Sequence, residues 1–124
     1  IIDLQKKLDI IMMFISYDIS VISETCNKIG VMYAGNMIEH TDTYTLFDNP
    51  LHPYTRALMS SFPSIEGPRR RLEPVPGEPP DLLNLPGGCS FYPRCSCAKG
   101  ICEKERPEYV EVEKDHFLAC HRVI

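Results

Sequence analysis

The stretch IGVMYAGNMIEHT, residues 29–41, decides the fold of this chain. Gly35-Asn36 lies near its centre, and this dipeptide is typical of the two-residue turn of a β-hairpin. The flanking segments, Ile29 to Ala34 and Met37 to Thr41, are therefore predicted as two strands joined at that turn.

Upstream of the hairpin, Ile10 to Ile15 is a run of six consecutive apolar residues. Such a run has the length of a strand and is typical of a parallel strand buried on both faces. A helix is expected on each side of it, the second with Asp18 as its N-cap. The expected apolar faces are Ile1, Leu4 and Leu8 on the first helix, and Ile19, Ile22 and Cys26 on the second.

Downstream of the hairpin, two more helices are expected. Asp42 can cap a short helix that ends at Asn49-Pro50. Pro53 suits the first turn of a helix that continues to Phe62, because its missing N–H costs nothing there. The order helix, buried strand, helix, hairpin predicts an α/β fold at the trailing edge of a mostly parallel sheet.

The composition changes near Pro63. Residues 1–62 contain two of the eleven prolines and one of the six cysteines, whereas residues 63–124 contain the rest. This shift predicts a boundary between an α/β segment, 1–62, and a small irregular cysteine-rich extension, 63–124. Within the extension, short strands are expected at Leu72 to Val75, Tyr109 to Val112 and Phe117 to Cys120.

The charge and the apolar pattern exclude several functions. A net charge of -4 and a pI near 5.5 argue against nucleic-acid binding driven by positive charge. No apolar run approaches the eighteen residues of a membrane-spanning helix, and no secretory leader is visible. The start at Ile1 suggests a fragment whose N-terminus lies upstream.

Four cysteines form the most informative pattern in the extension: Cys89, Cys95, Cys102 and Cys120. Five, six and seventeen residues separate them in turn, on a segment rich in proline and glycine. Four thiolates of this kind can hold an iron–sulfur cluster or a zinc ion, or can form two disulfides. Zinc would also have His116 and His121 nearby, but the spacing differs from the usual zinc knuckle. Disulfides fit poorly beside an α/β segment of cytosolic character.

Three stretches carry a family resemblance: FISYDIS (14–20), VMYAGNMIE (31–39) and FDNPLHPYTRAL (47–58). Together they resemble the ATP-binding subunit of oligopeptide/dipeptide ABC transporters. PGEPP (76–80) and the cysteine-rich run resemble the C-terminal extension of that family. The resemblance covers essentially the whole chain.

The resemblance implies that the chain is the trailing part of a P-loop ATPase lobe followed by the family's extension. The parent would be a cytoplasmic ATPase at the inner face of the cell membrane, powering the import of peptides or nickel. Its partners would be a second ATPase subunit and transmembrane permease subunits, with no nucleic acid. The resemblance also implies that Cys89, Cys95, Cys102 and Cys120 hold a [4Fe-4S] cluster.

The chain departs from the family pattern in three ways. The phosphate loop Gly-x-x-x-x-Gly-Lys-Ser/Thr, the signature motif and the acidic magnesium site are absent, so ATP and magnesium are expected to bind only in a full-length subunit. Tyr17 stands where the family has its catalytic switch histidine, and tyrosine cannot act as a proton-carrying imidazole. Cys97 is an extra thiol outside the four-cysteine pattern.

Overall fold

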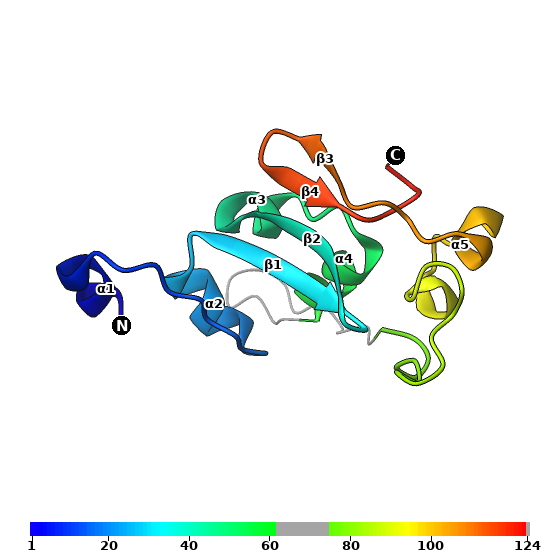
Figure 1. Ribbon diagram of the computed structural model, residues 1–124, viewed down its shortest axis with the longest axis horizontal. Helices are drawn as coiled ribbons and strands as arrows, with labels where there is room; N and C mark the ends of the chain where they lie inside the picture. The colour runs from blue at the N-terminus through cyan, green and yellow to red at the C-terminus, as the bar shows by residue number, and fades with distance from the viewer. Residues whose placement is uncertain (62–74, 124) are drawn as a thin grey trace, which may run out of the picture.

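A four-stranded antiparallel sheet forms the centre of the molecule (Figure 1). The computed structural model describes residues 1–61 and 75–123. The strands are β1 (Lys28–Tyr33), β2 (Asn36–Asp42), β3 (Val110–Glu113) and β4 (His116–Leu118). Their order across the sheet is β1-β2-β4-β3, so strands from both halves of the sequence build one sheet.

The β1–β2 hairpin is confirmed, but its turn lies one residue earlier than the sequence suggests. Ala34 and Gly35 have φ values of 47° and 79°, and two such residues in succession match the primed turn that suits a tight hairpin. Asn36 is already in β2, where it pairs with Tyr33, and its side chain donates a hydrogen bond to the carbonyl of Ala34 at 3.0 Å.

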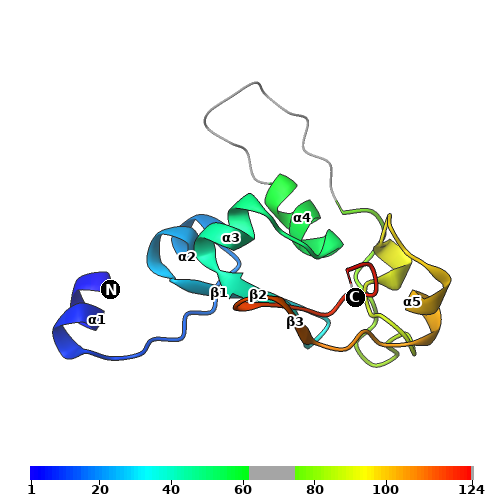
Figure 2. The ribbon, with the colours of Figure 1, turned by 90° about the horizontal axis from the view of Figure 1, so that it is seen from above.

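Three helices lie on one face of the sheet: α2 (Ile19–Thr25), α3 (Thr43–Asp48) and α4 (Pro53–Ser60) (Figure 2). Their predicted starts are confirmed. The Asp18 carboxylate accepts from the first-turn N–H of Ser20 at 3.0 Å, and Asp42 accepts from the N–H of Thr45 at the same distance. Pro53 occupies the first turn of α4.

The core lies between the sheet and these helices and includes one residue from the cysteine-rich segment. A register shift in the β1–β2 pairing leaves Ile38 without a direct partner on β1, and Ile38 turns into the core. Each apolar side chain that is fully buried there contributes roughly 1.5–3 kcal/mol of stability. The buried cluster consists of Ile29, Val31, Tyr33, Ile38, Leu46 and Phe91.

The prediction of a buried strand at Ile10 to Ile15 is wrong for this structure. These residues form no strand, and Ile11 is fully exposed at 101%. A buried strand needs neighbouring strands for its N–H and C=O groups, and no described strand pairs with this run. Helix α1 (Ile2–Leu8) forms as predicted but buries no residue.

The expected parallel sheet is also corrected, because all three strand pairings are antiparallel. The β1–β2 and β3–β4 pairs are hairpins whose connections are too short for a parallel crossover. The β2–β4 pair joins strands that lie far apart in the sequence. In the second half, β3 and β4 confirm the two later predicted strands with shifted ends. The predicted strand at Leu72 to Val75 and the boundary at 62/63 fall on or beside residues outside those described.

No helix among the described residues is long and apolar enough to cross a bilayer.

Candidate metal centre

Four cysteines from separate parts of the chain meet at one hollow. Cys89 and Cys95 flank the short helix η1 (Tyr92–Arg94), Cys102 lies in α5 (Gly100–Lys104), and Cys120 follows β4. With Cys97 they line a small hollow of about 20 Å³. The structure therefore brings together the cysteines that the sequence nominates as ligands.

Backbone hydrogen bonds hold the loops of this hollow together. The N–H of Cys89 donates to the carbonyl of Cys102 at 2.8 Å, which joins the first cysteine loop to α5. The N–H of Lys99 points at the Cys102 sulfur at 3.4 Å. On the C-terminal side, a ring nitrogen of His121 lies 2.9 Å from the carbonyl of Glu105 and anchors the last turn beside α5.

The approach of the Cys89 loop to α5 depends on Gly88. A Cβ atom added at Gly88 would collide with the carbonyl oxygen of Cys102 and would lie 2.6 Å from the backbone of Glu103. At the neighbouring Gly87, an added Cβ would meet no atom within 4 Å. Gly88 is therefore required by close backbone contact, and Gly87 is not.

Three thiols of the hollow are harder to deprotonate than a free cysteine. Burial raises the pKa of the Cys89, Cys95 and Cys120 thiols, and the neighbouring cysteines raise it further because adjacent thiolates repel one another. Without a cation, these groups favour the neutral thiol. A metal centre reverses that preference, because a coordinating thiol is deprotonated.

The spacing of the donors is a separate constraint. All six cysteines are free thiols. Among residues 1–61 and 75–123, no three His, Cys, Asp or Glu side chains converge closely enough to hold a single metal ion. In a four-iron cluster each thiolate binds a different iron, so the sulfurs stand farther apart than four ligands of one zinc ion.

Two residues outside the four-cysteine pattern differ from each other in exposure. Cys97 is exposed, and its sulfur accepts a hydrogen bond from the Arg122 guanidinium at 3.0 Å. Cys26 is partly buried against the core beside α2, as expected for a small apolar residue.

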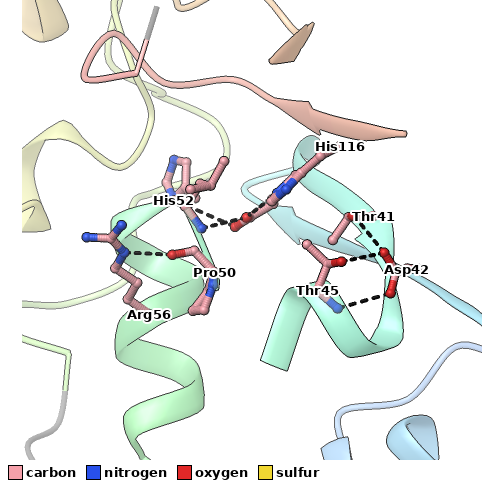
Figure 3. A network of polar contacts seen from close by, with 9 residues as sticks. Thr41, Asp42, Thr45, Pro50, His52, Arg56 and His116 are labelled. Carbon is pink, nitrogen blue, oxygen red and sulfur yellow. Dashed lines mark hydrogen bonds and ion pairs between the residues drawn. The ribbon is translucent and has the colours of Figure 1, made fainter. Parts of the chain in front are cut away.

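Next to the hollow lies a buried polar network that the sequence analysis missed. The Glu39 carboxylate on β2 is 0% exposed and accepts from the N–H groups of Leu51 and His52, at 2.7 and 3.0 Å. The third partner is the ring Nε2 of His116 on β4, at 2.8 Å. Figure 3 shows His52 and His116 on opposite sides of this carboxylate.

His116, which the sequence suggested as a possible zinc ligand, belongs to this network. Its ring bonds Glu39 and does not line the hollow. Its other ring nitrogen, Nδ1, has no hydrogen-bond partner among the described residues. One feature of the sequence could have indicated this network. Glu39, a charged residue, lies opposite the apolar Val31 on the inward face of the hairpin.

His52 connects this network to the hollow. Its ring is 1% exposed, lines the hollow, and lies 5.7 Å from the Phe91 ring, centroid to centroid. Its Nδ1 accepts from the N–H of Tyr54 at 3.0 Å, so His52 is the N-cap of α4. Tyr54 in turn packs on Tyr33 and Phe91. In the His-Pro-Tyr sequence, His52 therefore caps α4, Pro53 occupies its first turn, and Tyr54 packs it against the cysteine loop.

Burial determines the protonation of His52. Desolvation lowers its pKa to about 4, while the negative charge of Glu39 acts in the opposite direction. At neutral pH the ring is therefore uncharged, which agrees with Nδ1 acting as a hydrogen-bond acceptor.

Tyr17 lies apart from the cysteine site. Its side chain is 97% exposed and directly precedes the N-cap of α2. Helices α2 and α5 lie at opposite ends of the sheet (Figures 1 and 2). The structure therefore does not bring Tyr17 and the cysteines together, and a catalytic role for Tyr17 stays a prediction.

Comparison with known proteins identifies the family. The family model described as "Oligopeptide/dipeptide transporter, C-terminal region" matches residues 38–102, just over half of the chain. The match includes the His-Pro-Tyr sequence and three of the four cysteines.

Curated relatives agree with this match. The chain is 43% identical over 119 residues to the dipeptide transport ATP-binding protein DppD of Caldanaerobacter subterraneus subsp. tengcongensis, covering 96% of this chain and 36% of that protein. It is 43% identical over 122 residues to the oligopeptide transport ATP-binding protein AppF of Bacillus subtilis, covering 96% and 37%. The chain spans about a third of the length of the curated relatives it matches. The chain belongs to the oligopeptide/dipeptide transporter C-terminal region family, which confirms the resemblance seen in the sequence.

Proposed function

We propose that this chain is the C-terminal portion of the ATP-binding subunit of an ABC importer for oligopeptides or dipeptides. The support is the family match together with relatives named as peptide-transport ATP-binding proteins. Residues 1–62 would complete the nucleotide-binding lobe, and residues 63–124 would form the extension. In the full subunit, ATP hydrolysis with magnesium would power peptide uptake through permease subunits at the inner face of the membrane, beside a second ATPase subunit.

We further propose that the extension holds a [4Fe-4S] cluster on Cys89, Cys95, Cys102 and Cys120. The observation that supports this proposal is that all four thiols line one hollow. When bound, such a cluster supplies four iron–thiolate bonds and a one-electron redox couple. The residues of the chain supply the thiolates and the partly enclosed space.

The metal content of protein purified without oxygen tests the cluster. We expect a brown protein with iron and acid-labile sulfide, both lost when any one of the four cysteines is changed to serine. Cys97→Ser and Cys26→Ser are the matched controls and should keep both, because Cys26 lies outside the hollow and Cys97 outside the four-cysteine pattern. A colourless protein with stoichiometric zinc would support the alternative, a non-enzymatic zinc module. Protein without metal and with oxidised cysteine pairs would exclude both.

The coupling role has its own test. The sequence contains no phosphate loop, so we expect the 124-residue chain alone to release no phosphate from ATP above background. The upstream reading frame should encode Gly-x-x-x-x-Gly-Lys-Ser/Thr in frame. A frame without that loop would instead favour a separate metal-binding module that pairs with an intact subunit.

A further inference from the structure

The β3–β4 hairpin and its flanking residues, 106–120, form a flap at the edge of the sheet opposite β1 (Figure 1). Both ends of this flap meet beside α5, because a ring nitrogen of His121 lies 2.9 Å from the carbonyl of Glu105, the C-cap of that helix. Between its ends, β4 pairs with β2 at Glu39 and His40, whereas β1 pairs with β2 along its whole length. The flap is therefore hinged at Glu105 and His121 and attached to β2 over a short segment.

The buried side of the flap combines one apolar and one polar contact. Leu118 and His116 are the side chains of the flap that are at most 1% exposed. The Nε2 of His116 lies 2.8 Å from the Glu39 carboxylate on β2. An ion pair between Asp115 and Lys28 also links the turn of the flap to β1, but both side chains are more than half exposed, and such pairs add little stability. The Glu39–His116 hydrogen bond is therefore the main polar contact that closes the flap.

The closed flap leaves one of its polar atoms unsatisfied. The Nδ1 of His116 is buried and has no hydrogen-bond partner among the described residues. A buried polar atom without a partner costs free energy, which is regained when the atom meets water. If the flap opens, Glu39 still accepts from the N–H groups of Leu51 and His52. Opening the flap alone therefore costs less than unfolding the core, which would remove all three donors from this carboxylate.

The flap ends at the cysteine hollow. Its last residue is Cys120, which lines the hollow. The N–H of the preceding residue, Ala119, donates to the carbonyl of Ile38 on β2 at 2.9 Å. The opposite wall is held separately, by the N–H of Cys89 and the carbonyl of Cys102 at 2.8 Å. Movement of the flap would therefore displace the Cys120 side of the hollow and leave the other side in place.

We propose that the β3–β4 flap opens as a unit when the Glu39–His116 hydrogen bond breaks, and that this opening exposes Cys120 and widens the cysteine hollow. The hinge, the β1–β2 hairpin and helices α2 to α4 stay folded in the open state. Local opening of this kind is expected where few buried contacts hold a segment. An open flap would give a metal ion or cluster a way into a hollow of about 20 Å³, but the motion itself belongs to the metal-free chain.

Amide hydrogen exchange and cysteine alkylation of the reduced, metal-free 124-residue chain test this inference. The N–H of Ala119 reports the flap, and the hydrogen-bonded amides of β1 report the core. We expect Ala119 to exchange at least about tenfold faster than the amides of β1. Equal exchange rates would show that the flap opens only when the whole chain unfolds, and would overturn the inference.

Alkylation with iodoacetamide, followed by peptide mass spectrometry, gives a second readout. Cys89 is the matched comparison for Cys120, because both thiols are partly buried and burial raises the pKa of each. We expect Cys120 to be labelled faster than Cys89, since the opening of the flap exposes Cys120 alone. Labelling of Cys89 as fast as Cys120 would contradict a motion confined to one side of the hollow.

Three substitutions test the role of the Glu39–His116 hydrogen bond. His116→Leu removes the bond but keeps an apolar side chain, whereas His116→Gln retains an N–H donor that can reach the position of Nε2. Lys28→Ala is the control, because it removes the exposed ion pair between the flap and β1.

We expect His116→Leu to accelerate both Ala119 exchange and Cys120 labelling by about tenfold or more, because the lost hydrogen bond involves a charged carboxylate. His116→Gln should lie closer to the wild type, and Lys28→Ala should stay within about twofold of it. The β1 amides should keep their wild-type protection in all three variants. Unchanged Ala119 exchange in His116→Leu, or equal acceleration of Ala119 and β1, would overturn the inference. If His116→Leu fails to fold, the wild-type comparison of Ala119 with β1 decides, and no outcome depends on the iron content.

Discussion

At the scale of single residues, Glu39 is the group whose loss the fold tolerates least. Its carboxylate joins β2, the start of α4 and β4 through three hydrogen bonds in a site without solvent. A buried charge with its partners in place need not add net stability, but removing one member leaves the others desolvated and unpaired.

We therefore predict that Glu39→Ala lowers the free energy of unfolding by about 3–5 kcal/mol. The substitution leaves two buried backbone N–H groups and the Nε2 of His116 without an acceptor. Urea unfolding followed by circular dichroism measures the change. The control is Glu113→Ala on the exposed side of β3, which should stay within about 0.5 kcal/mol of the wild type. A loss below about 1 kcal/mol for Glu39→Ala would contradict the network.

The buried ring of His52 should make the free energy of unfolding depend on pH. Its pKa is lowered from 6.5 to about 4 by burial, so the unfolded chain takes up the proton at a higher pH than the folded one. The stability that neutral His52 confers is complete above pH 6.5 and is lost as the pH falls toward 4. The groups that face it are Glu39, His116 through that carboxylate, and the thiols of the hollow.

Between pH 8 and pH 4.5, we expect the wild type to lose about 3 kcal/mol more stability than His52→Asn. Urea midpoints at matched pH values, on metal-free protein, give the comparison. Subtracting the variant removes the contribution of carboxylates that titrate in both proteins. Parallel stability curves for the two proteins would show that folding does not lower the pKa of His52.

At the scale of elements, the features that the sequence predicted well are those determined by residues close together in the chain. The caps at Asp18 and Asp42 and the proline start of α4 depend on residues within one helical turn. The turn residues indicated the hairpin itself. Its register also depends on the bulge at Ile38, which the sequence pattern does not reveal. The predicted turn was therefore one residue too late.

What the sequence could not predict depends on distant partners. An apolar run such as Ile10 to Ile15 has the composition of a strand, but it becomes one only if other strands lie beside it. The insertion of β4 next to β2 joins residues 77 positions apart, as in the Glu39–His116 pair. The cysteine spacing indicated the donors of the candidate site, but not that His52 lines the hollow.

The cysteine loop gives a prediction at this scale. Gly88→Ala should prevent the Cys89 loop from approaching α5, because the new Cβ would collide with the carbonyl of Cys102. We expect at least a severalfold loss of bound iron in anaerobic protein, together with faster amide exchange at Cys89, whose N–H bonds that carbonyl. Gly87→Ala, one residue earlier and in open space, is the matched control and should keep its iron. Equal iron content in the two variants would contradict the close-packed geometry.

At the scale of the whole molecule, the cysteine-rich segment and the hairpin share one core. Phe91 lies among Tyr33, Tyr54 and His52, and the Arg94 side chain bonds both the Tyr33 hydroxyl at 3.3 Å and the carbonyl of Pro76 at 2.8 Å. On the other side, the N–H of Ala119 donates to the carbonyl of Ile38. The cysteine loop and the sheet are therefore joined by continuous packing and hydrogen bonds.

Tyr17 allows a prediction that separates folding from turnover. In the 124-residue chain its side chain is almost fully exposed, so Tyr17→His should change the free energy of unfolding by less than about 0.5 kcal/mol. In a full-length subunit we expect the same substitution to raise ATP turnover by about tenfold or more, because imidazole supplies a second nitrogen and an accessible protonation that a phenol lacks.

Phosphate release by the purified full-length subunit, measured at saturating ATP and magnesium, tests the effect on turnover. Tyr17→Phe is the matched control, since it keeps the ring and removes the one hydrogen bond that tyrosine can donate. We expect Tyr17→Phe to fall at or below the wild type while Tyr17→His rises above it. Equal or lower turnover in Tyr17→His would mean that Tyr17 does not occupy the position of the switch histidine, or that another side chain already performs its role.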